Sequence, residues 1–153
     1  MFNIVLFEPE IPPNTGNIIR LCANTGASLH LIEPLGFTLD DRKLHRAGLD
    51  YHEFASVKKY ANYADFIAKN KPERIFACST KGTKNYFTTE FCSDDFLLFG
   101  PETRGLPQEV LADFSAEKII RIPMLAQSRS LNLSNAVAVV LYEALRQVKN
   151  VLL

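Results

Sequence analysis

The stretch from residue 3 to residue 32, NIVLFEPEIPPNTGNIIRLCANTGASLHLI, decides the fold class of this chain. Two apolar runs, Asn3–Phe7 and Ser28–Ile32, predict strands, and the pattern between them predicts a helix over Asn14–Thr25. This helix is entered through Pro12-Pro13 and ends before a glycine, as helices commonly begin and end. A strand, a helix and a strand in succession indicate a parallel β-α-β unit.

The same alternation continues along the rest of the chain. Further strands are predicted over Arg74–Ser79, Phe96–Phe99 and Lys118–Ile122, and further helices over Tyr60–Lys69, Pro107–Phe114 and Asn132–Val148. The predicted strands are continuously apolar, which is typical of strands covered on both faces. We therefore expect an α/β fold, with an open, mostly parallel sheet and helices on both faces, in one domain over residues 1–153.

The composition is that of a globular protein with no general attraction for polyanions. Apolar residues make up 47% and charged residues 22% of the 153 residues, which argues against disorder. Lys+Arg and Asp+Glu both number 17, so any nucleic acid would have to dock on a local basic patch. The best candidate is the group Arg42, Lys43, His45 and Arg46, and Lys58-Lys59 and Lys81/Lys84 are weaker ones. Each could also be ordinary solvated surface.

Several classes of protein are disfavoured by what the sequence lacks. The three cysteines, Cys22, Cys78 and Cys92, show no C-x-x-C spacing, and the three histidines, His30, His45 and His52, have no metal-ligand spacing. The first residues lack the basic region and cleavage site of a signal peptide, and no apolar run approaches ~20 residues. We expect a cytoplasmic protein without a metal site or a membrane span.

Unusual loops follow the predicted strands, at residues 8–17, 79–82, 100–107 and 123–132. They concentrate polar, Gly and Pro residues after apolar strands. In open parallel sheets, ligands bind beyond the carboxyl ends of the strands, so we place the functional site there. The loops contain no G-x-G-x-x-G, no G-x-x-x-x-G-K-[ST] and no G-x-S-x-G, which disfavours a dinucleotide site, a P-loop NTPase and a hydrolase.

Three motifs in these loops carry a family resemblance. They are NTGNIIR at 14–20, FGPETRGLP at 99–107, and IPM at 122–124 followed by SRSLNLSNA at 128–136. Together they resemble the motifs of the SPOUT class of RNA methyltransferases, over residues 1–148. The resemblance implies a C-terminal trefoil knot that forms the pocket for S-adenosyl-L-methionine, S-adenosyl-L-homocysteine as the product, and a homodimer packed partly through the last helix.

The activity implied by the resemblance is methylation of a ribose 2′-hydroxyl in tRNA. The expected target is the wobble nucleotide, C or modified U, in the anticodon stem-loop of leucine tRNAs. A catalytically silent RNA-binding or regulatory module of the same fold is one alternative, and a 2′-O-methyltransferase acting on ribosomal RNA is another. The chain has no appended RNA-binding domain, which favours a compact target.

The resemblance also assigns the site residues. The expected cofactor-binding residues are Cys78, Gly100, Glu102, Ile122, Met124, Ser130 and Leu131. The expected catalytic residues are Arg20, Asn14, Ser130, Asn132 and Tyr142. Because a guanidinium does not readily lose its proton, Arg20 is expected to hold a phosphate or to stabilise the charge developing on the ribose oxygen, rather than to act as a free base.

The predicted last helix has apolar residues on two sides. One face carries Leu133, Ala136, Val137, Val140, Leu141, Ala144, Leu145 and Val148 at helical spacing. A second apolar strip consists of Ala138, Val139 and Tyr142. Another element of the same chain or a second subunit could cover this second apolar strip.

Overall fold

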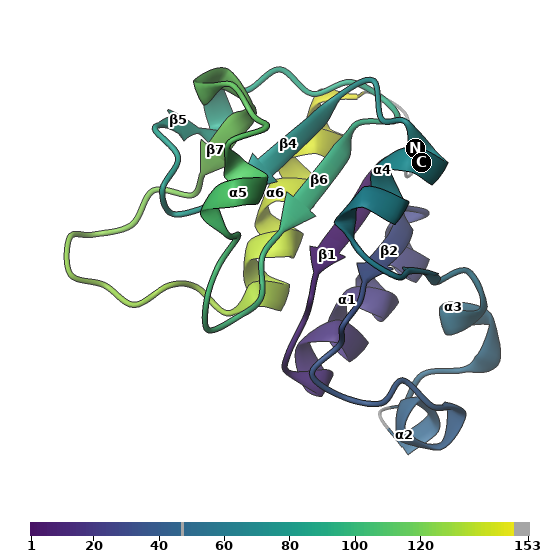
Figure 1. The fold of residues 1–153 in the computed structure, drawn as a ribbon. Helices are drawn as coiled ribbons and strands as arrows, with labels where there is room; N and C mark the ends of the chain where they lie inside the picture. Colours follow the sequence, from purple (N-terminus) through teal and green to yellow (C-terminus); the bar gives the residue numbers. More distant parts are fainter. Residues whose placement is uncertain (47, 149–153) are drawn as a thin grey trace.

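The computed structural model describes residues 1–46 and 48–148, which form a parallel sheet between two layers of helices (Figure 1). The strand order is β3-β2-β1-β6-β4-β7-β5, and all six strand pairs are parallel. The strands are β1 (Asn3–Phe7), β2 (Ser28–Ile32), β3 (Lys58–Tyr60), β4 (Ile75–Cys78), β5 (Lys84–Asn85), β6 (Phe96–Phe99) and β7 (Ile119–Arg121). The helices are α1 (Pro12–Thr25), α2 (Asp41–Arg46), α3 (Tyr51–Ala55), α4 (Tyr63–Asn70), α5 (Gln108–Leu111) and α6 (Leu133–Gln147), with 3₁₀ turns η1 (Tyr86–Thr88) and η2 (Ala116–Lys118).

Successive residues of the central strands enter two separate cores. Ile4 faces a core that contains Ile18 of α1 and Val137 of α6. Its neighbour Val5 faces a second core with Phe66 of α4 and Val110 of α5. Both sides of the sheet are therefore covered, which explains the continuously apolar strands and confirms the predicted layers.

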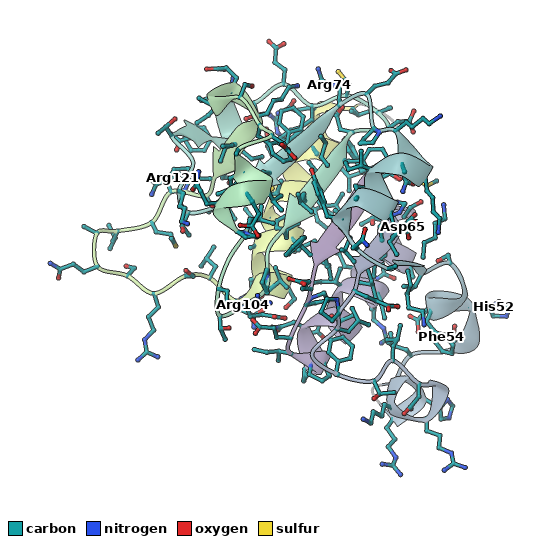
Figure 2. The ribbon with its side chains drawn as sticks, in the orientation of Figure 1. His52, Phe54, Asp65, Arg74, Arg104 and Arg121 are labelled. Carbon is teal, nitrogen blue, oxygen red and sulfur yellow. The ribbon has the colours of Figure 1, made fainter. Side chains whose placement is uncertain are left out.

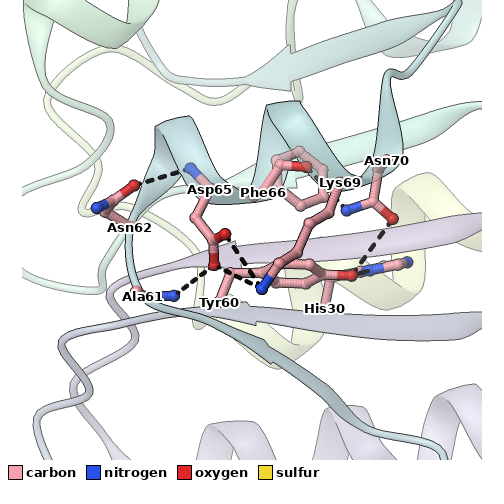
Figure 3. A network of polar contacts seen from close by, with 8 residues as sticks. All are labelled: His30, Tyr60, Ala61, Asn62, Asp65, Phe66, Lys69 and Asn70. Carbon is pink, nitrogen blue, oxygen red and sulfur yellow. Dashed lines mark hydrogen bonds and ion pairs between the residues drawn. The ribbon is translucent and has the colours of Figure 1, made fainter.

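The helix predicted over Tyr60–Lys69 was wrong at its start. Tyr60 ends the edge strand β3, and α4 begins at Tyr63 because the Asn62 side chain accepts a hydrogen bond from the Asp65 N–H at 2.8 Å (Figure 3). The Tyr60 hydroxyl instead contacts His30 of β2, at 2.8 Å from its Nδ1. The Asn62 cap and the buried contact between Tyr60 and His30 together set the start of α4 at Tyr63, later than the apolar pattern predicts.

The helix predicted over Pro107–Phe114 is also shorter than expected. Only Gln108–Leu111 is helical, and Asp113 and Phe114 then donate to carbonyls three residues earlier, as in tight turns. The apolar pattern of the sequence did not predict β3, α2, α3, β5, η1 and η2. Each has two to six residues, which is too short to show a periodic pattern.

Helix α6 begins where the third motif ends. The Asn132 side chain caps it by accepting from the Ser134 and Asn135 N–H groups. Its predicted apolar face packs on α1 and the sheet, as expected. The second apolar strip is not covered within the described chain: Val139 is 38% exposed and Tyr142 49% exposed.

The carboxyl ends of β1, β6, β4 and β7 lie at one edge of the sheet, because these strands are adjacent and parallel. The four loops identified from the sequence therefore meet there, with residues 122–132 forming a long projecting loop (Figure 1).

Candidate functional site

A cavity of about 250 Å³ lies among these loops. The segments that line it are 78–81, 99–106, 120–122, residue 124, 130–131 and the first half of α6. All seven residues predicted to bind the cofactor line this one cavity: Cys78, Gly100, Glu102, Ile122, Met124, Ser130 and Leu131. The structure thus brings them together, and their contact with a cofactor stays a prediction.

We name this cavity the cofactor cavity after the predicted contacts. Its walls combine apolar and polar surface. Leu106, Leu133 and Val140 are buried apolar residues of the lining. Arg104, in the loop after β6, and Arg121, the last residue of β7, also belong to the lining; both are labelled in Figure 2. Such a mixture suits a ligand with a flat apolar ring and polar substituents.

Gly100 lets two stretches of backbone approach closely at the cavity wall. A Cβ at this position would lie 2.4 Å from the Leu106 nitrogen and 2.5 Å from the Gly105 carbonyl carbon. Gly105 itself has a φ of 67°, in the left-handed region. The loop of the second motif therefore folds back on itself, and only glycine fits at Gly100.

Hydrogen bonds join the three motifs beside the cavity. The Glu102 carboxylate accepts from the Glu10 N–H at 2.7 Å, the Ile11 N–H at 3.2 Å and the Asn14 amide at 3.5 Å. The Asn132 amide in turn donates to Asn14 Oδ1 at 2.9 Å. Asn14, Glu102 and Asn132 therefore form one chain of contacts that fixes the loops relative to one another.

Further hydrogen bonds join the loop after β1 to the loop after β6, and here the acceptor is the Glu10 side chain of the first loop. Glu10 accepts from the Thr103 N–H at 2.9 Å and from its hydroxyl at 2.8 Å, and Arg104 lies 3.8 Å away. These hydrogen bonds, with a smaller contribution from the Arg104 charge, lower the pKa of Glu10 below its usual value. Glu10 and Thr103 were not predicted as site residues, although both lie in loops that the sequence places at the site.

Arg20 does not line the cofactor cavity. It lines a second cavity, of about 540 Å³, on α1. Its guanidinium donates to the Gly48 carbonyl and pairs with Glu53, with 3.1 Å between Nε and Oε1, while half of the side chain stays exposed. Tyr142 lines neither of these two cavities and points from the open face of α6.

The predicted catalytic residues are therefore only partly assembled in one chain. Ser130 lines the cofactor cavity, Asn14 and Asn132 bond to each other beside it, Arg20 lies in the second cavity, and Tyr142 is apart. No observation tests their catalytic roles, which stay predictions.

Comparison with known families decides the class of this site. The model of the SpoU rRNA methylase family matches residues 1–142, which include all three motifs. The chain belongs to this family. The resemblance to the SPOUT class is thereby confirmed.

Close relatives of this SpoU family chain act on tRNA. It is 63% identical, over 96% of both chains, to the tRNA (cytidine(34)-2′-O)-methyltransferase of Saccharophagus degradans. It is 47% identical to a solved structure from work on the 2-OH methylation of C/U34 on tRNA, with a TM-score of 0.88 and coverage of 97% and 96% of the two chains. An AdoMet-bound rRNA methyltransferase from Sinorhizobium meliloti is 29% identical, with a TM-score of 0.82 over 97% of this chain and 57% of that one.

Cys78 of this SpoU family chain is a wall residue rather than a nucleophile. Burial raises the pKa of its thiol well above the usual value, so the thiol stays protonated at neutral pH. Among residues 1–46 and 48–148, no group of three or more His, Cys, Asp and Glu is placed to hold a metal ion. No helix in the same ranges is long and apolar enough to cross a membrane.

Proposed function

We propose that this protein transfers a methyl group from S-adenosyl-L-methionine to the ribose 2′-hydroxyl of nucleotide 34 in tRNA. Two of the three motifs line one cavity, and the first motif is hydrogen-bonded to both of them beside it, in a chain 63% identical to an enzyme named for this reaction. This observation carries the proposal. We take leucine tRNAs as the substrates, as the resemblance implies.

The cofactor cavity fits S-adenosyl-L-methionine by its chemistry. Leu106, Ile122 and Leu133 offer apolar surface to the adenine, and Ser130 and backbone groups of the loops offer hydrogen bonds to the polar parts. When bound, this cofactor supplies a methyl group on a positively charged sulfur. The trefoil knot that the resemblance implies would place the loop at 122–132 and α6 around it.

The remaining chemistry belongs to the chain's own residues. Methyl transfer would join the ribose oxygen to the methyl carbon that the cofactor supplies, leave S-adenosyl-L-homocysteine as the product, and release the hydroxyl proton to solvent or to a base. The positive charge of the Arg20 guanidinium stabilises the oxygen or the adjoining phosphate. Asn14 and Asn132 hold the loops in register through their 2.9 Å hydrogen bond.

We further propose that the functional unit is a homodimer. In one chain Tyr142 lines neither cavity, so in a catalytic role it would have to serve a site on a second copy. The exposed second apolar strip, which includes Tyr142, offers a surface for that copy. The single domain and the cytoplasmic location expected from the sequence stay predictions.

The test is methyl transfer to defined RNA. The purified protein is incubated with unmodified leucine tRNA and labelled S-adenosyl-L-methionine, and the nucleosides are analysed by mass spectrometry. We expect one 2′-O-methyl group, at position 34. If ribosomal RNA accepts the label instead, the substrate is wrong; if the cofactor binds and neither RNA is labelled, the protein is the silent module.

A further inference from the structure

The second cavity has two kinds of wall. It lies between the start of α1, residues 37–39 and α2, at the end of the molecule where α2 and α3 are found (Figure 1). Its volume of about 540 Å³ is in the range of ligand sites. One part of its wall is apolar and consists of Pro12, Pro13, Phe37, Leu39 and Leu49. Another part is basic and consists of Arg20, Lys43 and Arg46.

Two of the three cations are free to bind an anion. Arg20 is paired with Glu53, but Lys43 and Arg46 form no ion pair with any residue that the structure describes. Among the side chains that the structure describes, no carboxylate lines the cavity. Lys43 and Arg46, both on α2, therefore leave the cavity with uncompensated positive charge.

A buried hydroxyl in the lining also lacks a partner. Thr15 is 1% exposed, and its Oγ1 makes no hydrogen bond, unlike the Thr25 hydroxyl, which donates to the Leu21 carbonyl at 2.8 Å. A buried hydroxyl without a partner is destabilising, so such groups usually bind something. The backbone just before Asn14 has no free N–H to donate to Thr15 Oγ1, because Pro12 and Pro13 have no N–H and the Ile11 N–H is bound to Glu102.

We propose that the second cavity binds a nucleotide of the substrate RNA, with its phosphate at Lys43 and Arg46 and its base against Phe37 and the prolines. A ligand with an anionic group and a flat apolar ring satisfies both walls, whereas inorganic phosphate satisfies only the basic one. That the ligand is RNA rests on the proposed function.

The position of the cavity indicates which nucleotide it takes. It shares no lining residue with the cofactor cavity, so its nucleotide is not the one presented to the cofactor of the same chain. The two cavities are nevertheless neighbours across the first turn of α1. Asn14, bonded to Glu102 of the cofactor cavity, is followed directly by Thr15 of the second cavity. A nucleotide close to the target in the same strand can therefore reach it.

The experiment measures the affinity of the full chain for an anticodon stem-loop RNA at several salt concentrations. The variant Lys43→Gln/Arg46→Gln should bind about tenfold or more weakly, with a salt slope smaller by about 0.7 for each phosphate that the variant no longer neutralises. Phe37→Ala should bind about fivefold or more weakly without a change of slope. Lys71→Gln, at an exposed lysine outside the cavity lining and outside the predicted basic patches, is the control and should bind as wild type.

A further variant separates binding from folding. Thr15→Val keeps the shape and removes the hydroxyl, so the melting temperature should stay or rise while RNA affinity falls. Cofactor affinity should be unchanged in every variant, and cytidine monophosphate should compete better than inorganic phosphate.

Failure of the second site and failure of the proposed function give different results. Wild-type RNA affinity and salt slope in the double variant and in Phe37→Ala, in a protein that methylates tRNA, would overturn the second site alone. Equal competition by phosphate and the nucleotide would also overturn it. Loss of RNA binding in these variants of a protein that methylates no RNA would support the site and remove the proposed function.

Discussion

Asn14, Glu102 and Asn132 show how single side chains turn three separate motifs into one site. Their sequence separations are 88 and 118 residues, yet two hydrogen bonds link them. Asn14 lies in the first turn of α1, Asn132 caps α6, and Glu102 lies in the loop after β6, so the parallel sheet brings the three together at the carboxyl ends of its strands. These three polar residues are the side chains on which the site's geometry depends.

Gly100 is the residue whose replacement most directly tests the shape of the cofactor cavity. In Gly100→Ala the new methyl group would meet backbone at 2.4 and 2.5 Å, and the loop must shift. We expect about 1–3 kcal/mol less stability and a cofactor affinity reduced by at least about tenfold. Gly105→Ala is the control: it has no atom within 4 Å of its Cβ and a φ of 67°, so it should cost about 1 kcal/mol and disturb cofactor binding less. Calorimetry with S-adenosyl-L-methionine and thermal unfolding measure both.

Arg20 and Glu53 test the electrostatic part of the mechanism. Arg20→Ala should lower turnover by roughly 10²–10³-fold with little change in cofactor affinity, and Arg20→Lys should rescue poorly because lysine lacks the planar fork. In the wild-type structure the Glu53 carboxylate accepts a hydrogen bond from the Asp50 N–H at 2.7 Å. Glu53→Gln keeps an acceptor for this N–H but removes the charge that orients Arg20. It should lower kcat more than it raises KM for tRNA. Normal single-turnover rates in Arg20→Ala would remove Arg20 from the mechanism.

At the scale of elements, long periodic segments were predictable and short ones were not. The α6 face and the β1, β2 and β6 strands match the sequence closely, because a dozen or so residues of helix, or a run buried on both faces, leave a clear pattern. The boundary between β3 and α4 does not match the prediction from the sequence, because the position of Tyr60 depends on a contact with His30, thirty residues earlier. The motifs located the cavity lining, but Glu10–Thr103 and Arg20–Glu53 are pairings that only the fold creates.

The edge formed by β2, β3 and α4 should respond to pH through His30 (Figure 3). Its ring is 1% exposed and contacts Tyr60 Oη at 2.8 Å and Asn3 Oδ1 at 3.2 Å. Burial, with a smaller effect from the Lys58 charge, lowers the pKa of His30 from 6.5 to about 4. The unfolded chain therefore takes up a proton as the pH falls through 6.5, and the folded chain does not until about 4.

The free energy of unfolding should accordingly fall by about 1.4 kcal/mol per pH unit between pH 6.5 and 4 and be insensitive to this group above 6.5. The carboxylates with lowered pKa, such as Glu10, act in the same direction but only below about 4.5. His30→Gln should be less stable at pH 7.5 and show a flatter profile from 6.5 to 5. Urea unfolding of both proteins across this range measures the difference; parallel profiles would contradict the assignment.

At the scale of the whole molecule, the parallel sheet and its two helix layers could be expected from the sequence, but the strand order and the completeness of the site could not. Periodicity shows which faces are apolar and says nothing of what covers them. One described chain leaves Tyr142 outside both cavities and leaves Val139 exposed. A catalytic role for Tyr142 therefore depends on assembly with a second copy of the chain.

The second apolar strip provides the test of that assembly. Val139 and Tyr142 lie on the solvent-facing side of α6, with the buried face of the same helix turned to α1 and the sheet. Val139→Glu would place a charge in the proposed interface, where it would lose water without gaining a partner. It should not disturb the core, because Val139 is not part of it. We expect a folded monomer with normal thermal unfolding.

The same variant should still bind the cofactor, since Val139 does not line that cavity, but it should no longer hold tRNA or methylate it. The formal net charge of zero leaves each chain with only local basic patches, and two copies side by side would double the phosphates that can be neutralised. Val139→Thr keeps the shape without a charge, so it should remain dimeric and active. Sedimentation, cofactor titration and tRNA binding are compared for the three proteins. A wild-type monomer that binds tRNA with full affinity would show that the strip has no part in assembly, and Tyr142 would then have no route into the reaction.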